Sequence, residues 1–260
     1  MRQNSHCPLP TDMHLFTDQS EAAFRLPSSY HLIPRVSNSD LTRLKEEYLG
    51  YGTIPSARWY PETARTFGRA FHSHLLEPES VGGVIRQLLP DLAPSDSDKL
   101  DTLTDRIRRD PFCRRYLNGT SQRERIVLFT DPETGVACKS RIDLLHTSPK
   151  RRSALILDFK TTSARSQSQF LQSCYDYDYD RQAAFYLDAL RYAESGEWAD
   201  TRRFRFVLIG VQKQRPNRLF AVEATDIPNF IDYGRKKYRF WLRKWNERQD
   251  EPEVRWRLAS

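Results

Sequence analysis

The sequence predicts an α/β fold, with a mixed central sheet of about five strands flanked by helices and an N-terminal helical extension. Two observations predict it. Apolar residues recur at helical spacing over 38–111, and three apolar runs of strand length follow over 124–160. A helical stretch then separates the third run from two further strands, and helices inserted between strands are typical of α/β folds.

The N-terminal part begins with an irregular segment and continues with helices. Residues 1–37 are loop-rich and contain four prolines, which predicts an irregular arm, and residues 38–260 predict a single domain. Asn38 or Ser39 can cap the first helix, which Gly50 ends. The expected helices cover 38–50, 61–75 and 97–111, the last one stopping at Pro111.

The second half alternates between strands and helices. A hairpin with its turn at 131–135, a third strand, a helix, a second hairpin with its turn at 214–217 and a last helix are expected. The expected strands are Glu124–Phe129, Val136–Leu145, Ala154–Lys160, Phe204–Gln212 and Leu219–Ala224, and the expected helices contain Arg181–Glu194 and Ile227–Arg248.

Composition favours a polyanionic partner. The net charge is +7 and the pI about 9.3, a balance that alone does not separate DNA from RNA or acidic membranes. No apolar stretch has the length of a membrane span, and the polar start lacks a signal-peptide core, so a soluble cytoplasmic protein is expected. The four cysteines are scattered, which predicts reduced and mostly buried thiols: Cys7, Cys113, Cys138 and Cys174.

The strongest chemical signal is a pair of charges in the apolar run ALILDFK. Asp158 and Lys160 share one side of a strand because side chains alternate with period two. On the preceding run Asp143 shares its parity with Lys139 and Arg141, opposite to Cys138, Ile142 and Leu144. Two carboxylates and a lysine converging at paired strands suit a hard divalent cation and metal-assisted phosphodiester hydrolysis. The alternative is a surface ion pair at a frayed strand end.

Five motifs in order carry a family resemblance. They are GRAFHSHLLEPES, a glutamate at Glu124, KSRIDLL, ILDFKTT and YDYDRQAAFYLDAL. Together they resemble the PD-(D/E)xK nuclease superfamily over about residues 37–245. Within it they resemble the exonuclease VIII type of phage and mobile-element exonucleases, which are related to lambda exonuclease.

The resemblance implies a restriction-endonuclease-like core and a magnesium-dependent deoxyribonuclease, with Mn²⁺ able to substitute. It further implies a 5′-to-3′ exonuclease on double-stranded DNA ends in recombination, a homo-oligomer and a single-strand annealing protein as partner. A restriction or defence-type endonuclease and a non-catalytic DNA-binding subunit are the alternatives. Some such nucleases carry a four-cysteine iron–sulphur cluster, and none is expected here because no cysteine group follows Cys174.

The resemblance also assigns roles to the residues around the two charged strands. Asp143, Asp158 and the backbone carbonyl of Phe159 would hold the metal, and Lys160 would orient the attacking water and offset charge on the phosphate. His72, on a helical stripe with Gly68, would join the metal ligands, an isolated structural histidine being the alternative.

Three weaker assignments complete the expected site. Glu124 would lie near a second metal or the phosphate, or be a plain solvent-facing strand carboxylate. Gln182 and Tyr186, one helical turn apart, match a Q-x-x-x-Y helix that supports the site and contacts DNA, or Tyr186 only packs on the sheet.

Several other charged and aromatic groups stay open as DNA contacts. The repeat at 175–180 reads as a loop leading into the Q-x-x-x-Y helix, or as a strand, and its tyrosines receive no catalytic role. Basic groups that are candidates for phosphate contacts, or only a solvated surface, are Lys150, Arg151, Arg152, Arg235, Lys236, Lys237, Arg243 and Lys244.

Overall fold

The computed structural model describes residues 27–50, 62–77 and 94–250. The chain divides into two compact units, Met1–Pro34 and Arg35–Ser260. In the first unit the described element is a 3₁₀ helix, η1 (Pro27–Leu32). In the second unit Val36 already pairs with the sheet, its N–H donating to the carbonyl of Ala137 at 3.1 Å. The following paragraphs concern this larger unit.

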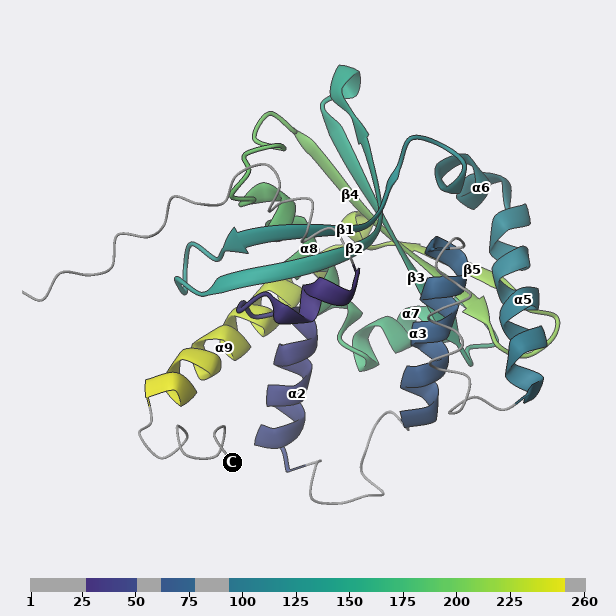
Figure 1. Cartoon of the computed structure of the whole chain (residues 1–260), viewed down its shortest axis with the longest axis horizontal. Coiled ribbons are helices and arrows are strands. Elements are labelled where there is room, and N and C mark those ends of the chain that lie inside the picture. The colour runs from purple at the N-terminus through teal and green to yellow at the C-terminus, as the bar shows by residue number, and fades with distance from the viewer. Residues whose placement is uncertain (1–26, 51–61, 78–93, 251–260) are drawn as a thin grey trace, which may run out of the picture. The chain divides into compact units, whose positions relative to one another are not determined.

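A single five-stranded sheet lies at the centre of this unit (Figure 1). Its strands follow the chain order from one edge to the other, and all neighbours are antiparallel except the third and fourth strands, which are parallel. The sheet is therefore mixed, as the sequence predicts. The strands are β1 (Gln122–Thr130), β2 (Ala137–Ser148), β3 (Ser153–Thr162), β4 (Arg203–Gln212) and β5 (Leu219–Glu223).

Helices cover both faces of the sheet through two separate apolar clusters. One cluster joins the sheet to α2, α7, α8 and α9, and the other joins it to α3, α5 and α6. This layering confirms the predicted α/β class. The helices are α2 (Asn38–Tyr48), α3 (Glu62–Leu76), α5 (Pro94–Arg109), α6 (Pro111–Leu117), α7 (Gln167–Asp176), α8 (Tyr179–Arg191) and α9 (Phe230–Asp250), with short 3₁₀ turns η4 (Pro149–Arg151) and η5 (Ala224–Asp226).

Two helix boundaries differ from the sequence prediction. The cap of α2 is Ser37, one residue before the predicted Asn38 and two before Ser39, because Ser37 and Asp40 bond each other's backbone N–H groups in a capping box. Pro111 ends one helix but also begins α6, since Asp110 accepts from the N–H of Cys113 and proline is well tolerated in a first helical turn.

The repeat of tyrosine and aspartate at 175–180 is neither a strand nor a plain loop. Tyr175 and Asp176 end α7, an additional helix, and Tyr179 begins α8. Only Tyr177 and Asp178 connect them, with Asp178 in the left-handed region at φ 54°. The two helices form the crossover that the parallel β3–β4 pair requires.

Strict alternation along β1 and β2 fails at one point. Leu145 packs in the same cluster as Ile142, whereas Leu144 packs in the other, so the predicted shared parity of Ile142 and Leu144 is wrong. The reversal occurs opposite Glu124, whose φ of 49° is left-handed. Both strands therefore turn their side chains over at the Glu124–Asp143 level.

Two basic residues of α9, Arg235 and Lys237, contact carboxylates of other elements. Arg235 Nε lies 2.6 Å from Asp188 Oδ2, and Lys237 Nζ contacts both Asp178 and Asp180. These five residues, with Tyr238, are called the α8–α9 seam below. Arg235 and Lys237 are consequently engaged in structural ion pairs and not in a solvated face open to DNA.

Two further expectations concern the described residues only. Cys113, Cys138 and Cys174 are buried free thiols. Across the described ranges, no helix has both the length and the apolar character needed to cross a membrane.

Candidate active site

The predicted pair on β3 is present and largely removed from solvent. Lys160 Nζ lies 2.6 Å from Asp158 Oδ2, and the two side chains are 14% and 0% exposed. The Lys160 ammonium also lies 4.9 Å from the centre of the Tyr179 ring, which comes from the start of α8. Asp158 Oδ1 is buried without a hydrogen-bond partner among the described residues. The interpretation as a frayed surface ion pair is therefore wrong.

Asp143 lies where β2 turns its side chains over, and there it bridges two elements. Its Oδ2 accepts from the backbone N–H of Phe159 at 2.9 Å and lies 3.2 Å from His72 Nδ1 on α3. The side chain thus replaces a ladder bond between β2 and β3 beyond the Leu144–Leu157 pair. This contact joins the two strands at the level of the candidate site.

Glu124 belongs to the same group of side chains. It is only 11% exposed and receives the Arg141 guanidinium, whose Nε lies 2.8 Å from Glu124 Oε2. One donor atom each from His72, Glu124 and Asp143 lie within 4.8 Å of one another. Glu124 is therefore not a plain solvent-facing carboxylate, and the left-handed backbone at this residue is what separates its orientation from that of its strand neighbours.

Two carboxylates of the site are held where negative charge is unfavourable. Burial raises the pKa of Glu124 to about 7, although the Arg141 guanidinium opposes this shift. Burial also raises the pKa of Asp158 to about 6 against the opposing charge of Lys160. A cation supplied to the site would favour the charged form of both groups.

The pKa values of Asp143, His72 and Lys160 shift in the direction that favours the charged form of each group. Burial raises the pKa of Asp143, but the His72 and Lys160 charges outweigh it and leave this pKa below its usual range. Burial lowers the pKa of His72 and of Lys160, and neighbouring carboxylates outweigh it, so both pKa values are raised. Lys160 is accordingly an ammonium at neutral pH.

The donor set fits a divalent cation on two grounds. Carboxylate oxygens with one imidazole are a normal set for such an ion, and they converge from α3, β1 and β2. The orphaned Oδ1 of Asp158 is a second ground, because a buried oxygen without a partner is costly unless a ligand satisfies it.

Gln182 and Tyr186 lie on α8 as predicted. Gln182 Nε2 donates to Tyr186 Oη at 3.2 Å, and the Tyr186 ring packs in the apolar core near Phe206. Tyr179 precedes Gln182 by three residues on the same helix and contacts Lys160, so α8 is tied to the site through Tyr179. No catalytic role was predicted for Tyr179, and its i, i+3 spacing to Gln182 was the available signal.

Fold and site together define a PD-(D/E)xK nuclease fold, with two acids and a lysine on adjacent strands of a mixed sheet. Residues 54–252 match the family described as "PDDEXK-like domain of unknown function (DUF3799)", and the chain belongs to this family. The predicted superfamily is thereby confirmed, and it supports a nuclease.

Two solved structures are similar to this chain at low sequence identity, and the first of them supports the fold. A crystal structure of a protein from Eubacterium rectale, described as a "putative exonuclease", is 15% identical with a TM-score of 0.54 and covers 96% of this chain and 86% of its own. The crystal structure of SSO0001 is 15% identical with a TM-score of 0.31 and covers 77% of this chain and 84% of its own. No curated protein matches the chain.

Proposed function

We propose that this protein is a metal-dependent deoxyribonuclease that uses magnesium, or manganese in its place, to hydrolyse DNA phosphodiester bonds. The observation that carries the proposal is the convergence of Asp143, Asp158 and Lys160 beside the His72–Glu124 donors. A degenerate DNA-binding subunit has no need of this buried charge set, whose assembly is costly for folding.

Each residue has a separate task in the proposed reaction. His72, Asp143, Asp158 and the Phe159 carbonyl would hold the metal, with Glu124 beside them; when bound, the metal polarises the phosphate and acidifies water. Asp143 in addition fixes the spacing of β2 and β3 through the Phe159 N–H. Metal-donor atoms that are held in place by backbone contacts keep their geometry during turnover, as catalysis requires.

Lys160 would act as a fixed positive charge. Its raised pKa keeps it protonated, so it serves to orient water and to offset charge on the pentacovalent phosphate instead of accepting a proton. Asp158 and the Tyr179 ring hold the ammonium from two sides. Gln182 and Tyr186 would support this arrangement from α8 and contact the DNA backbone.

The proposed reaction is end-dependent and runs 5′ to 3′ on duplex DNA, in recombination, with a ring-shaped homo-oligomer and a single-strand annealing protein as partner. Its support is the resemblance of the motifs to exonuclease VIII, which extends through YDYDRQAAFYLDAL, together with the basic net charge of +7. A restriction or defence-type endonuclease is the competing activity on this fold.

A paired substitution tests the chemistry. Lys160→Ala is expected to lower cleavage of labelled linear duplex in magnesium at least about a thousandfold, because it removes a charge used mainly in the transition state. DNA binding should persist. Arg106→Ala, which removes an exposed arginine in α5, is the control and should retain activity. Full activity in Lys160→Ala, or cleavage that survives exhaustive chelation, would refute the proposal.

A second experiment separates the two modes of cleavage. Linear plasmid should be degraded to nucleotides and single strand, and covalently closed circles of the same sequence should stay intact. Duplexes labelled on one strand at the 5′ or 3′ end report polarity, since early release of the 5′ label marks 5′-to-3′ digestion. Efficient nicking of closed circles would establish an endonuclease and leave only the metal chemistry standing.

A further inference from the structure

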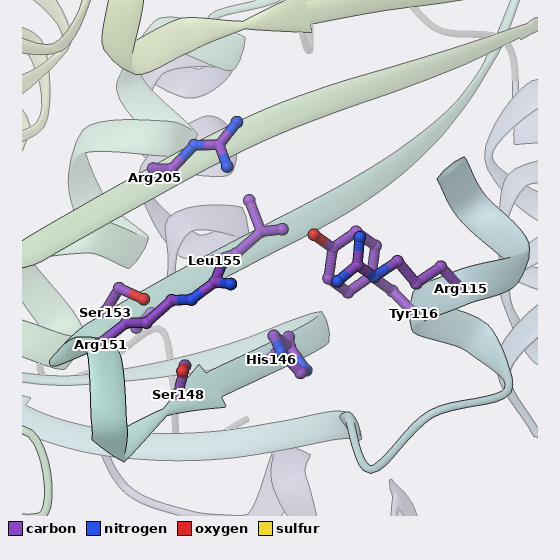
Figure 2. A pocket seen from close by; sticks show the side chains of 9 residues that line it. Arg115, Tyr116, His146, Ser148, Arg151, Ser153, Leu155 and Arg205 are labelled. Carbon is purple, nitrogen blue, oxygen red and sulfur yellow. The ribbon is translucent and has the colours of Figure 1, made fainter. Parts of the chain in front are cut away.

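A cavity lies away from the candidate active site. It has a volume of about 280 Å³ and lies among α6, the ends of β2 and β3, η4 and β4. Figure 2 shows Arg151, Arg205, Tyr116 and His146 arranged around Leu155, with their polar ends turned toward the shared space. The cavity is called the arginine pocket below, after Arg115, Arg151 and Arg205.

The guanidinium groups of this pocket are only partly neutralised. Among the described residues, neither Arg115 nor Arg151 has a carboxylate partner, and no acidic residue lines the cavity. Arg205 forms a bidentate ion pair with Glu223, in which its Nε and Nη2 each lie 2.6 Å from a carboxylate oxygen. Its Nη1 takes no part in this ion pair. Within the described ranges, the three guanidinium groups of the pocket therefore have one carboxylate partner, that of Glu223. In the α8–α9 seam, by contrast, Arg235 donates to carboxylates through Nε, Nη1 and Nη2.

The remaining lining suits a phosphate group and its attached sugar or base. The hydroxyls of Tyr116, Ser148 and Ser153 make no hydrogen bond with other residues in the described part of the chain, so they are free to donate. The Tyr116 ring contacts His146 edge-to-face at 5.1 Å between centroids, and Arg115 lies over that ring at 5.8 Å. Guanidinium forks and hydroxyls bind phosphate oxygens, and an aromatic face can stack a base.

We propose that the arginine pocket binds a phosphate group, supplied by a nucleic acid strand that also reaches the active site; the choice of DNA as the source rests on the proposed function. His146 of the pocket follows Asp143 by three residues on β2, and these two side chains contact Tyr116 of α6 and His72 of α3, on the same side of the sheet. Roughly 10 Å of β-strand therefore separates the pocket from the candidate active site. That distance corresponds to about three nucleotides of duplex rise. The arginine pocket thus holds the DNA strand at a fixed distance from the phosphodiester bond that is cut.

Charge-matched variants test this proposal. Arg115→Gln with Arg151→Gln removes two pocket charges, and Arg106→Gln with Arg114→Gln removes two charges from exposed residues outside the pocket. Both pairs are built in full-length Lys160→Ala protein, so that the labelled duplex stays intact. Fluorescence anisotropy against salt gives the affinity and its salt slope, and melting temperatures verify folding.

The expected result is a loss of DNA affinity confined to the pocket pair. Its Kd should rise about tenfold at about 0.1 M salt, and its log–log salt slope should fall by about two, while the control pair shifts much less. A second arm measures the rise in melting temperature with inorganic phosphate and with a deoxynucleoside monophosphate. If the pocket pair keeps the DNA affinity of the control pair but its melting temperature no longer rises with these probes, the phosphate source is a free nucleotide.

Indistinguishable behaviour of the two pairs in both arms would overturn the proposal. This result is separable from failure of the proposed function. If the unsubstituted protein does not cleave DNA and the pocket pair still loses affinity, the nuclease activity is refuted and the phosphate pocket stands.

Discussion

Asp158 and Asp188 are two fully buried carboxylates beside a cation, and the protein satisfies them differently. Asp188 accepts from Arg235 through two nitrogens, from Tyr238 and from Arg191. Asp158 faces Lys160 alone, and its Oδ1 has no hydrogen-bond partner in the described part of the chain. A saturated carboxylate holds helices together, and an unsaturated one is free to receive a ligand.

The largest expected effect follows from removing the unsaturated charge. Asp158→Asn should lower cleavage by at least about a thousandfold, because it takes away a metal donor. Its melting temperature in EDTA should fall by no more than about 3 °C, since the lost carboxylate was poorly satisfied. Endpoint cleavage assays and thermal unfolding measure the two quantities. A severe loss of stability with activity per folded molecule retained would reverse the comparison.

The saturated carboxylate should give the opposite outcome. Asp188→Asn is expected to lower the free energy of unfolding by about 3 kcal/mol, because Arg235 keeps its charge without a full partner. Urea denaturation measures this change. Asp232→Asn removes a 71%-exposed partner of the same arginine and should cost less than about 0.5 kcal/mol. Similar costs for both variants would show that Asp188 gains nothing from its burial.

Close packing of α8 against α9 sharpens the comparison without touching charge. A Cβ added at Gly234 would lie 2.0 Å from the Asp180 carbonyl oxygen, so Gly234→Ala should cost about 2 kcal/mol. At Gly68 no described atom lies within 4 Å of such a Cβ. Gly68→Ala in α3 should therefore stabilise the protein by up to about 1 kcal/mol in the same assay.

A smaller effect than that of Gly234→Ala is expected from a pH dependence in the α8–α9 seam. Burial raises the pKa of Asp178, but the Arg181, Lys45 and Lys237 charges outweigh it and leave this pKa below its usual range. Its contribution is thus present above about pH 4 and is lost as the pH falls through the folded-state pKa.

The substitution Asp178→Asn tests this pH dependence through the difference in the free energy of unfolding between the variant and the unsubstituted protein. It should destabilise by about 1.5 kcal/mol at pH 7, and the difference should shrink below about pH 4. Urea unfolding across pH measures it, with exposed Asp176→Asn as the control. A difference that grows on acidification would contradict the assigned sign.

The sequence predicted the sheet and most helices because their signals are local. The alternation in ILDFK and the helical spacing around Phe67 and Phe71 depend only on neighbouring residues. The helix α7 was missed since its first turn is polar, and only Phe170 and Cys174 of its residues are buried. The roles assigned to the site residues remain predictions.

Other features could not be read from local pattern. Glu124 adopts a left-handed conformation that is uncommon outside glycine and asparagine, so the reversal of side chains at Asp143 had no sequence signal. The arginine pocket is assembled from three distant stretches, around Tyr116, His146 and Arg205. The strand register aligns His146 and Arg205 on either side of Leu155, and the packing of α6 adds Tyr116.

The position of α9 in the chain also sets the order in which the protein can be completed during synthesis. Its Arg235, Tyr238 and Arg239 bond Asp188 and Asp131, which precede them by 47 to 108 residues. Until α9 has emerged from the ribosome, Asp188 and Asp131 lack the partners that make their burial favourable. Helix α8, which bears Tyr179, therefore reaches its final packing late. We expect a nascent chain to acquire a rigid candidate active site only after nearly all of this unit has emerged from the ribosome.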